Sequence, residues 1–410
     1  MKHGMLILSL FVCCHLATAN TWHVGKGKGL RSVNAAILAA ANGDTILVYA
    51  GTYYEKNIIV NKKLLLKGIG HPVLDGEKKY EVISVKANGS VIDGFTIVHS
   101  GVSSMEDMGG IKIYDSRDVV IQNNILEDTF FGIYVQYGKN CTVQNNQLVS
   151  YNPEEQQSGN GIHCWKSDSL RIIGNKITGH RDGIYFEFVT NSIIWLNTSF
   201  KNIRYGLHFM FSHNDAYIAN HFRDNGAGVA VMFSHGVKMY SNVFEENWGD
   251  AAYGLLLKEI SDSYIDGNTF IKNTSGIYME GASRIHMQKN LFKNNGWGMK
   301  IQASCMDIEV TLNNFIGNTF DVSTNGSLVL NSFNRNYWDK YDGYDLNKDK
   351  IGDVPYRPVS MYSMIVEKNP PAMLLFRSFI TSLLDKTEKV IPSLTPEALK
   401  DNSPLMKRLF

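Results

Sequence analysis

The chain has 410 residues, and its 40 Lys and Arg nearly balance its 39 Asp and Glu, so the formal net charge is +1. A near-neutral chain lacks the basic surface that nucleic acid requires, which argues against a nucleic-acid-binding protein. The cysteines after residue 20 are odd in number and widely spaced, which does not suggest a disulfide framework: Cys141, Cys164 and Cys305.

Residues 1–19 have the pattern of a secretory signal peptide. Lys2 precedes an apolar run over Met5–Leu16, and Ala17–Ala19 supplies the small residues of a cleavage site before Asn20. Further along, no stretch reaches the ~18 consecutive apolar residues of a membrane span. We therefore expect an exported, soluble mature protein.

Residues 20–100 are predicted to form an N-terminal cap and the first coils of the fold. Val33–Ala41 has the apolar stripe of a short helix, and strands are expected at Thr45–Val48, Asn57–Val60 and Lys63–Lys67. A helix at this end would cover strand edges that are otherwise open to pairing.

Residues 101–338 carry an internal repeat, a feature that decides architecture. A glycine followed by alternating apolar residues recurs every 22 or 23 residues, with two longer steps of 29 and 26 that predict loops at Pro153–Gly159 and around Trp248–Tyr253. The glycines are Gly110, Gly132, Gly161, Gly183, Gly206, Gly228, Gly254, Gly276 and Gly298. Asparagines keep the same spacing at Asn124, Asn146, Asn175, Asn197, Asn220, Asn242, Asn268, Asn290 and Asn314.

Each repeat holds short strands of period-two alternation between Asn, Gly, Asp and Ser corners. Such coils predict an all-β fold, a right-handed parallel β-helix with coils stacked ~4.8 Å apart. The asparagines suit left-handed corners, and their amides can bond to one another along the stack.

The repeat ends near Trp338, and two further segments are expected. Residues 339–369 are a closing segment rich in Asp, Gly and Tyr, and residues 370–410 are an amphipathic helix, Ala372–Asp385, with a docking tail. The apolar stripe of the helix consists of Ala372, Leu375, Phe376, Phe379, Ile380, Leu383 and Leu384.

The closing segment contains a candidate calcium site. Asp345, Asn347, Asp349 and Asp353 place oxygen donors at alternate positions, like the start of a calcium loop. Lys350 stands where an EF-hand needs glycine, so the EF-hand itself is excluded. A looser calcium-stabilised corner and a merely hydrated turn both remain open.

The main candidate site is a tetrapeptide, Met-Phe-Ser-His, that occurs at Met210–His213 and again at Met232–His235, 22 residues later. One repeat therefore stacks two thioethers and two imidazoles on the outer surface, a ligand set suited to Cu(I). His208, which also faces outwards by its offset, and Met239 are further candidate ligands. In the alternative interpretation, the methionines form an apolar patch against a partner protein and the histidines are ordinary corner residues.

A secreted polysaccharide lyase, epimerase or hydrolase is the competing function, because extracellular β-helices often cleave carbohydrate. Glu187 and Glu280 share a column but lie four coils apart, roughly 19 Å. A glycosidase pair needs about 5–10 Å, so these two carboxylates do not form one.

Three features together resemble the NosD family: the repeat, the string Gly206–Asn214, and the motifs Asn336–Asp345 and Gly352–Tyr356. The resemblance runs from the signal peptide to Ser403–Arg408. NosD proteins are periplasmic accessory proteins of nitrous oxide reductase maturation and are not enzymes.

The resemblance implies that the chain sits on an ABC permease with its ATPase. It implies that the Met and His residues hold Cu(I) transiently, between a copper chaperone lipoprotein and the apo reductase. It also implies that the helix Ala372–Asp385 and the tail dock on the permease.

Overall fold

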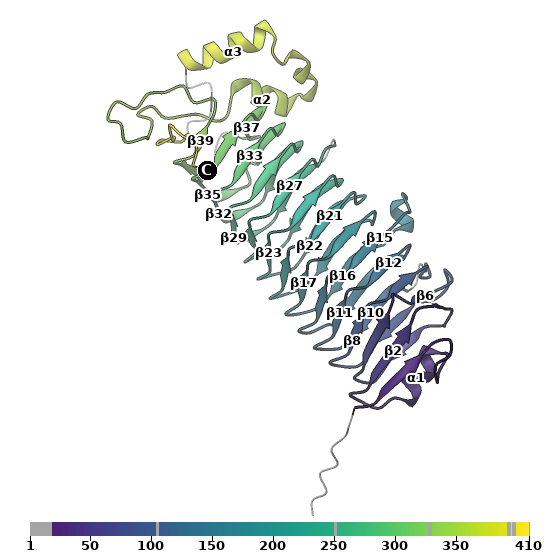
Figure 1. The fold of residues 1–410 in the computed structure, drawn as a ribbon. Coiled ribbons are helices and arrows are strands. Elements are labelled where there is room, and N and C mark those ends of the chain that lie inside the picture. The colour runs from purple at the N-terminus through teal and green to yellow at the C-terminus, as the bar shows by residue number, and fades with distance from the viewer. Residues whose placement is uncertain are drawn as a thin grey trace, which may run out of the picture.

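The computed structural model describes residues 19–103, 106–249, 252–326, 330–391, 395 and 399–409. Apart from Ala19, the predicted signal peptide lies outside these residues. The described chain is an elongated stack of coils with the helix α1 (Val33–Ala39) at one end and α3 (Phe379–Val390) beyond the other (Figure 1). The predicted parallel β-helix is confirmed.

Each coil contributes one strand to each of three parallel sheets, here called A, B and C. Sheet A contains β1 (Thr21–Val24), β2 (Thr45–Tyr49), β5 (Leu65–Ile69), β8 (Val91–Asp93), β11 (Val120–Gln122), β14 (Thr142–Gln144), β17 (Arg171–Ile173), β20 (Ile193–Trp195), β23 (Ala216–Ile218), β26 (Lys238–Tyr240), β29 (Ser261–Asp266), β32 (Ser283–Gln288), β35 (Met306–Thr311) and β38 (Leu330–Asn334).

Sheet B contains β3 (Thr52–Tyr53), β6 (Val73–Asp75), β9 (Thr96–Val98), β12 (Ile125–Glu127), β15 (Gln147–Val149), β18 (Lys176–Thr178), β21 (Thr198–Phe200), β24 (His221–Arg223), β27 (Val243–Glu245), β30 (Thr269–Ile271), β33 (Leu291–Lys293), β36 (Asn314–Ile316) and β39 (Tyr337–Trp338). Sheet C contains β4 (Ile58–Val60), β7 (Ile83–Val85), β10 (Gly109–Tyr114), β13 (Phe131–Gln136), β16 (Ile162–Trp165), β19 (Ile184–Glu187), β22 (Tyr205–Met210), β25 (Ala227–Met232), β28 (Tyr253–Lys258), β31 (Ser275–Glu280), β34 (Trp297–Ile301) and β37 (Phe320–Ser323).

The marker glycines begin the inward-outward alternation of sheet C. In β22, Leu207 and Phe209 are fully buried in the core, and Met210 points to the outside. Gly206 is required because a Cβ there would lie 2.7 Å from the carbonyl oxygen of Gly228 on the next coil. The repeat therefore records the close approach of successive coils.

A ladder of buried asparagine amides runs along the stack. Each Nδ2 donates to the Oδ1 of the asparagine one coil on, at 2.9 to 3.1 Å, and the last asparagine donates to the carboxylate of Asp401. The predicted ladder is confirmed with one correction: Asn313, rather than Asn314, supplies its rung, because Asn314 begins strand β36. A second ladder, not predicted, links Asn202, Asn225, Asn247, Asn273, Asn295 and Asn318.

The N-terminal helix is held at both ends by the coils it covers. The carboxylate of Glu55 accepts hydrogen bonds from the first amides of α1, Val33 N and Asn34 N. The ammonium of Lys62 donates to the carbonyl oxygens of Ile37, Leu38 and Ala40 at the other end. Both placements complement the helix dipole, and the predicted cap is confirmed.

The C-terminal region differs from the single helix predicted over Ala372–Asp385. It consists of α2 (Met361–Lys368), a 3₁₀ helix η2 (Pro370–Leu375) and α3. Arg377 adopts a left-handed φ of 60°, which breaks the helix, and the Ser378 side chain then caps α3. Apolar spacing alone does not reveal such a break.

The last described residues return to the end of the stack, and the docking role of the tail stays a prediction. Asp401 is buried and pairs with Phe333 and Tyr356, and Leu405 pairs with Tyr337. Residues 399–409 therefore close the end of the stack. Earlier in the chain, the short 3₁₀ helix η1 (Glu155–Gln157) lies in the predicted loop Pro153–Gly159.

Candidate metal site

The two repeated methionines lie side by side on the outer face of sheet C. Met210 on β22 pairs in register with Met232 on β25, and both side chains are half-buried. In the same column, Glu187 precedes Met210 and Lys258 follows Met232. The structure therefore brings the two thioethers onto adjacent coils, as the repeat length predicts.

The two repeated histidines form a stacked pair one corner further along the same coils. The rings of His213 and His235 have centroids 4.0 Å apart and lie 11° from parallel. The backbone amide of His235 donates to Nδ1 of His213 at 3.2 Å, so the proton of the neutral ring sits on Nε2. Partial burial, together with the charge of His235, lowers the pKa of His213, which favours the neutral imidazole that a metal requires.

Stacked imidazoles do not direct their lone pairs at a common point, because each lone pair lies in the plane of its own ring. For both rings to bind one ion, one of them must turn. If His213 coordinates through Nε2, its proton must move to Nδ1 and the bond from His235 N is lost, at a cost of about 1 kcal/mol. The rings of His213 and His235 are thus stacked at the surface, and metal binding would require one of them to turn.

A ladder of exposed phenylalanines separates the methionines from the histidines. Phe188, Phe211 and Phe233 occupy equivalent left-handed corners on three coils, and their rings stack at 5.3 and 5.0 Å. The side chains are 37–43% exposed. The sequence analysis missed this ladder, although the 23- and 22-residue spacing of the three residues was a signal for it.

Two further predicted ligands are not accessible. Met239 lies in the core with no exposed surface, so its place in the candidate metal set is wrong. His208 faces outwards as predicted but is only 6% exposed, between the rings of Tyr185 and Tyr205. Its Nδ1 lies 3.5 Å from the carboxylate of Asp182, which is too long for a good hydrogen bond.

His208 belongs to a buried column of aromatic rings on the outer face of sheet C. Tyr134, His163, Tyr185 and His208 follow one another with centroids 4.4 to 4.9 Å apart. Burial lowers the pKa of His163 to about 3, so its ring is neutral. These imidazoles are packed between neighbouring tyrosine rings on the outer face of sheet C.

The predicted calcium loop is closed by its own backbone. Asp345 accepts from the amides of Asp349 and Lys350, Asp349 accepts from Ile351 N, and Asp353 accepts from Leu346 N. Asn347 Oδ1 likewise accepts from Asp349 N. In the described part of the chain, no three His, Cys, Asp or Glu side chains gather as a metal-ligand group. These hydrogen bonds describe a closed turn, and the calcium site stays a prediction.

The C-terminal segment presents an unusually apolar surface. Phe379 and Val390 on α3 are 82% and 80% exposed, and Leu374 on η2 is 91% exposed. Of the predicted docking residues, Leu384 packs against the small cluster of Trp297, Phe320, Tyr362, Val366 and Ala372. The others are exposed: Leu375, Phe376, Phe379, Ile380 and Leu383.

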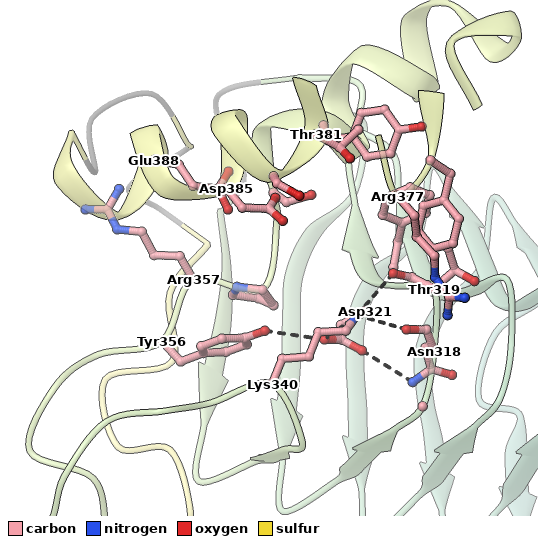
Figure 2. Close-up of a pocket in the computed structure, with 17 residues that line it drawn as sticks. Asn318, Thr319, Asp321, Lys340, Tyr356, Arg357, Arg377, Thr381, Asp385 and Glu388 are labelled. Atoms are coloured by element: carbon pink, nitrogen blue, oxygen red, sulfur yellow. Dashed lines mark hydrogen bonds and ion pairs between the residues drawn. The ribbon is translucent and has the colours of Figure 1, made fainter. Parts of the chain in front are cut away.

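A cavity of about 720 Å³ lies between α3 and the last coil (Figure 2). At its base, the buried carboxylate of Asp321 pairs with Lys340 at 3.4 Å and accepts from Tyr356 and Asn318. Thr381, Ser382, Asp385 and Glu388 of α3 line this cavity, whereas Leu384 packs against the apolar cluster that contains Phe320.

Comparison with known sequences finds similarity to one family of periplasmic proteins. The family model described as periplasmic copper-binding protein (NosD) matches residues 147–343, which include both Met-Phe-Ser-His strings, and a right-handed β-helix region matches residues 32–159. A probable ABC transporter binding protein NosD of Pseudomonas aeruginosa is 27% identical over 90% of this chain and 89% of its own length. The chain resembles NosD proteins over most of its length. The corresponding protein of Stutzerimonas stutzeri is 24% identical over 86% of this chain and 85% of its own length.

Solved structures with the same fold include carbohydrate-active enzymes. The A-module of the mannuronan C-5 epimerase AlgE6 of Azotobacter vinelandii superposes with a TM-score of 0.54 at 16% identity, over 77% of this chain and 93% of its own. An α-1,3-glucanase of Streptomyces thermodiastaticus gives 0.58 at 12% identity, over 79% and 69%. At these identities the likeness establishes the fold alone. Among the described helices, none is long and apolar enough to cross a membrane.

Proposed function

We propose that the chain is a periplasmic component of an ABC-transporter complex that binds Cu(I) transiently and hands it over for the maturation of nitrous oxide reductase. A copper chaperone lipoprotein is the proposed donor and the apo reductase the proposed acceptor. The permease and its ATPase are the proposed membrane partners.

The observation that carries the proposal is the pairing of Met210 with Met232 one coil apart, next to the stacked rings of His213 and His235. Thioethers and neutral imidazoles are soft and borderline ligands that suit Cu(I). The family match over this segment is to proteins described as periplasmic and copper-binding. Half-exposed ligands on an open sheet face leave room for the ligands of a second protein, which a handover site needs.

The apolar surface of η2 and α3 supports the docking part of the proposal. Large exposed apolar patches on a folded protein mark interaction sites. The relatives are named as ABC transporter binding proteins, and a short apolar helix at the end of a rigid stack suits contact with a permease. We assign transporter docking to Leu375, Phe376, Phe379, Ile380 and Leu383.

An anaerobic Cu(I) titration against a colorimetric chelator tests the metal assignment. The variant changes Met210 and Met232 to Leu and His213 and His235 to Ala, and the expected result is loss of the tightest site without loss of secondary structure. The matched control is Met306→Leu with His286→Ala. It removes an exposed methionine and an exposed histidine on sheet A, away from the candidate site. The control should bind like wild type, and equal affinity in both variants would refute the assignment.

A further inference from the structure

A second cavity, of about 500 Å³, opens on the outer face of sheet C near the N-terminal end of the stack. Its floor is Lys112 on β10, and four strand spacings of about 4.8 Å separate this strand from β22, which carries Met210. The cavity is therefore well separated from the candidate metal site. Its described lining residues are Asn57, Lys79, Tyr80, Glu81, Glu106, Asp107, Met108, Lys112, Tyr114 and Gln136.

Lys112 is an unusual lysine, because it is 7% exposed and lacks an ion-pair partner among the residues that the structure describes. Its Nζ donates to the carbonyl oxygen of Asp107 at 3.1 Å and lies 4.8 and 4.5 Å from the ring centroids of Tyr114 and Tyr134. An ammonium has three N–H groups. A buried charge with so few acceptors is costly unless a partner is supplied.

Lys300 provides the contrast within the same column. It occupies the equivalent outward position on β34, but its Nζ lies 2.9 Å from the carboxylate of Glu367. Both lysines also lie over aromatic rings. The fold therefore supplies a counterion to Lys300 and leaves Lys112 facing a cavity.

Glu81 does not neutralise Lys112, because its carboxyl group is engaged elsewhere. The Tyr114 hydroxyl lies 3.1 and 3.0 Å from the two oxygens and donates its single proton to this carboxyl group, and Ser84 contacts one of the oxygens. Ser84 Oγ also bonds to Asn57 Oδ1 at 2.7 Å, and one hydroxyl proton cannot serve both acceptors. A protonated Glu81 that donates to Ser84 resolves the conflict, in line with burial raising the pKa of Glu81.

We propose that this cavity binds an acidic saccharide, with the Lys112 ammonium holding the carboxylate of the sugar. The rings of Tyr80 and Tyr114 offer flat apolar surface, and Asn57 and Gln136 offer amides to sugar hydroxyls. The exposed side chains of Glu106 and Asp107 at the rim offer further acceptors to sugar hydroxyls. One negative charge beside many hydroxyls is the chemistry of a carboxylated sugar.

Two sources carry this chemistry, uronate polysaccharides and the lactyl-substituted amino sugar of cell-wall glycan. Calorimetric titration of the copper-free full chain with trigalacturonate and with a muramic-acid-containing disaccharide distinguishes them, and neutral maltotriose is the control ligand. One acidic saccharide should bind at least about tenfold more tightly than maltotriose. Binding of neither acidic saccharide at millimolar concentration, or equal binding of maltotriose, would overturn the proposal.

The decisive variant is Lys112→Met, with Lys300→Met as the matched control. Lys112→Met should weaken acidic-saccharide binding about tenfold or more, whereas Lys300→Met should bind like wild type. Thermal unfolding gives an independent readout. The unfolding temperature of Lys112→Met should be no lower than that of wild type, because the substitution removes an unpaired buried charge. A lowered unfolding temperature with unchanged binding would assign Lys112 to the fold. If Lys112→Met does not fold, Lys112→Gln replaces it in the same titration.

Discussion

Asp401 ends the first asparagine ladder, and its removal should destabilise the C-terminal coils. Its carboxylate has no exposed surface and accepts from Asn336 N at 2.9 Å, Asn336 Nδ2 at 3.0 Å and Trp338 Nε1 at 3.1 Å. It also accepts from the amides of Arg335 and Ser403. Every group that meets it is a donor, so a carboxylate, which only accepts, suits the position.

The magnitude follows from the donors that Asp401→Ala would leave unsatisfied. Three of them are buried, and each unsatisfied buried donor costs roughly 1–3 kcal/mol. Because alanine also removes a buried charge, we expect a loss of about 3–5 kcal/mol in the free energy of unfolding of this region. Asp401→Asn keeps one oxygen but turns an amide towards Arg335 and Ser403, so it should cost less, about 1–2 kcal/mol.

Hydrogen exchange of the Asn336 amide, together with urea unfolding followed by Trp fluorescence, measures the effect. Both are needed because a stacked-repeat protein opens locally. Asp262→Ala is the control, since Asp262 is an exposed partner of Arg284 and should leave the unfolding midpoint unchanged. The reasoning fails if Asp401→Ala exchanges and unfolds like wild type, or if it is more stable than Asp401→Asn.

Three further predictions follow from the site and the core. The pKa of His163 lies near 3 in the folded chain and about 6.5 when unfolded, so the unfolded state takes up the proton first. The free energy of unfolding therefore has its full value above pH 6.5 and decreases below that pH. The variant His163→Phe should reduce the decrease between pH 6.5 and 4.5 by about 2–3 kcal/mol, as measured by urea unfolding. A decrease equal to that of wild type would contradict this prediction. Because the pKa of His213 is lowered, Cu(I) affinity should hold down to pH 6.5 and decline only below it; a chelator titration that shows a decline already above pH 7 argues against His213 as a ligand. Phe379→Ser with Ile380→Ser should leave the circular dichroism spectrum unchanged and reduce co-purification with the permease and ATPase at least about tenfold; full retention would place the docking surface elsewhere.

Much of the fold could be predicted from the sequence because a coil repeats the same local constraints. A glycine such as Gly206 recurs where a Cβ would strike the next coil, and an asparagine such as Asn242 recurs where an amide must both donate and accept. The spacing also placed Met210 beside Met232, since a 22-residue step is one coil.

What the sequence could not supply depends on contacts between coils and inserted segments. The position of His208 relative to the repeat glycine predicted that its side chain points outwards. It did not predict that the side chain is buried, because the burial results from the neighbouring rings of Tyr185 and Tyr205. The core position of Met239 lies in sheet A, outside the glycine-marked strand that fixed orientation. The helix break depends on the backbone angles of Phe376 and Arg377, and the return of Asp401 to the last coil spans 65 residues from Asn336.

The regular stacking of coils also fixes the distance between the candidate metal site and the C-terminal helices. Met232 on β25 and the strand β37, which carries the base for the C-terminal helices, are four strand spacings apart in sheet C, about 19 Å. Each asparagine amide of the ladder is hydrogen-bonded to the asparagine of the next coil. A whole coil can therefore be added or removed without leaving a side-chain amide unpaired. The distance from the methionine pair to the C-terminal helices, which we propose dock on the transporter, is thus set in steps of about 4.8 Å. A one-coil deletion would shorten this distance while leaving both ends intact.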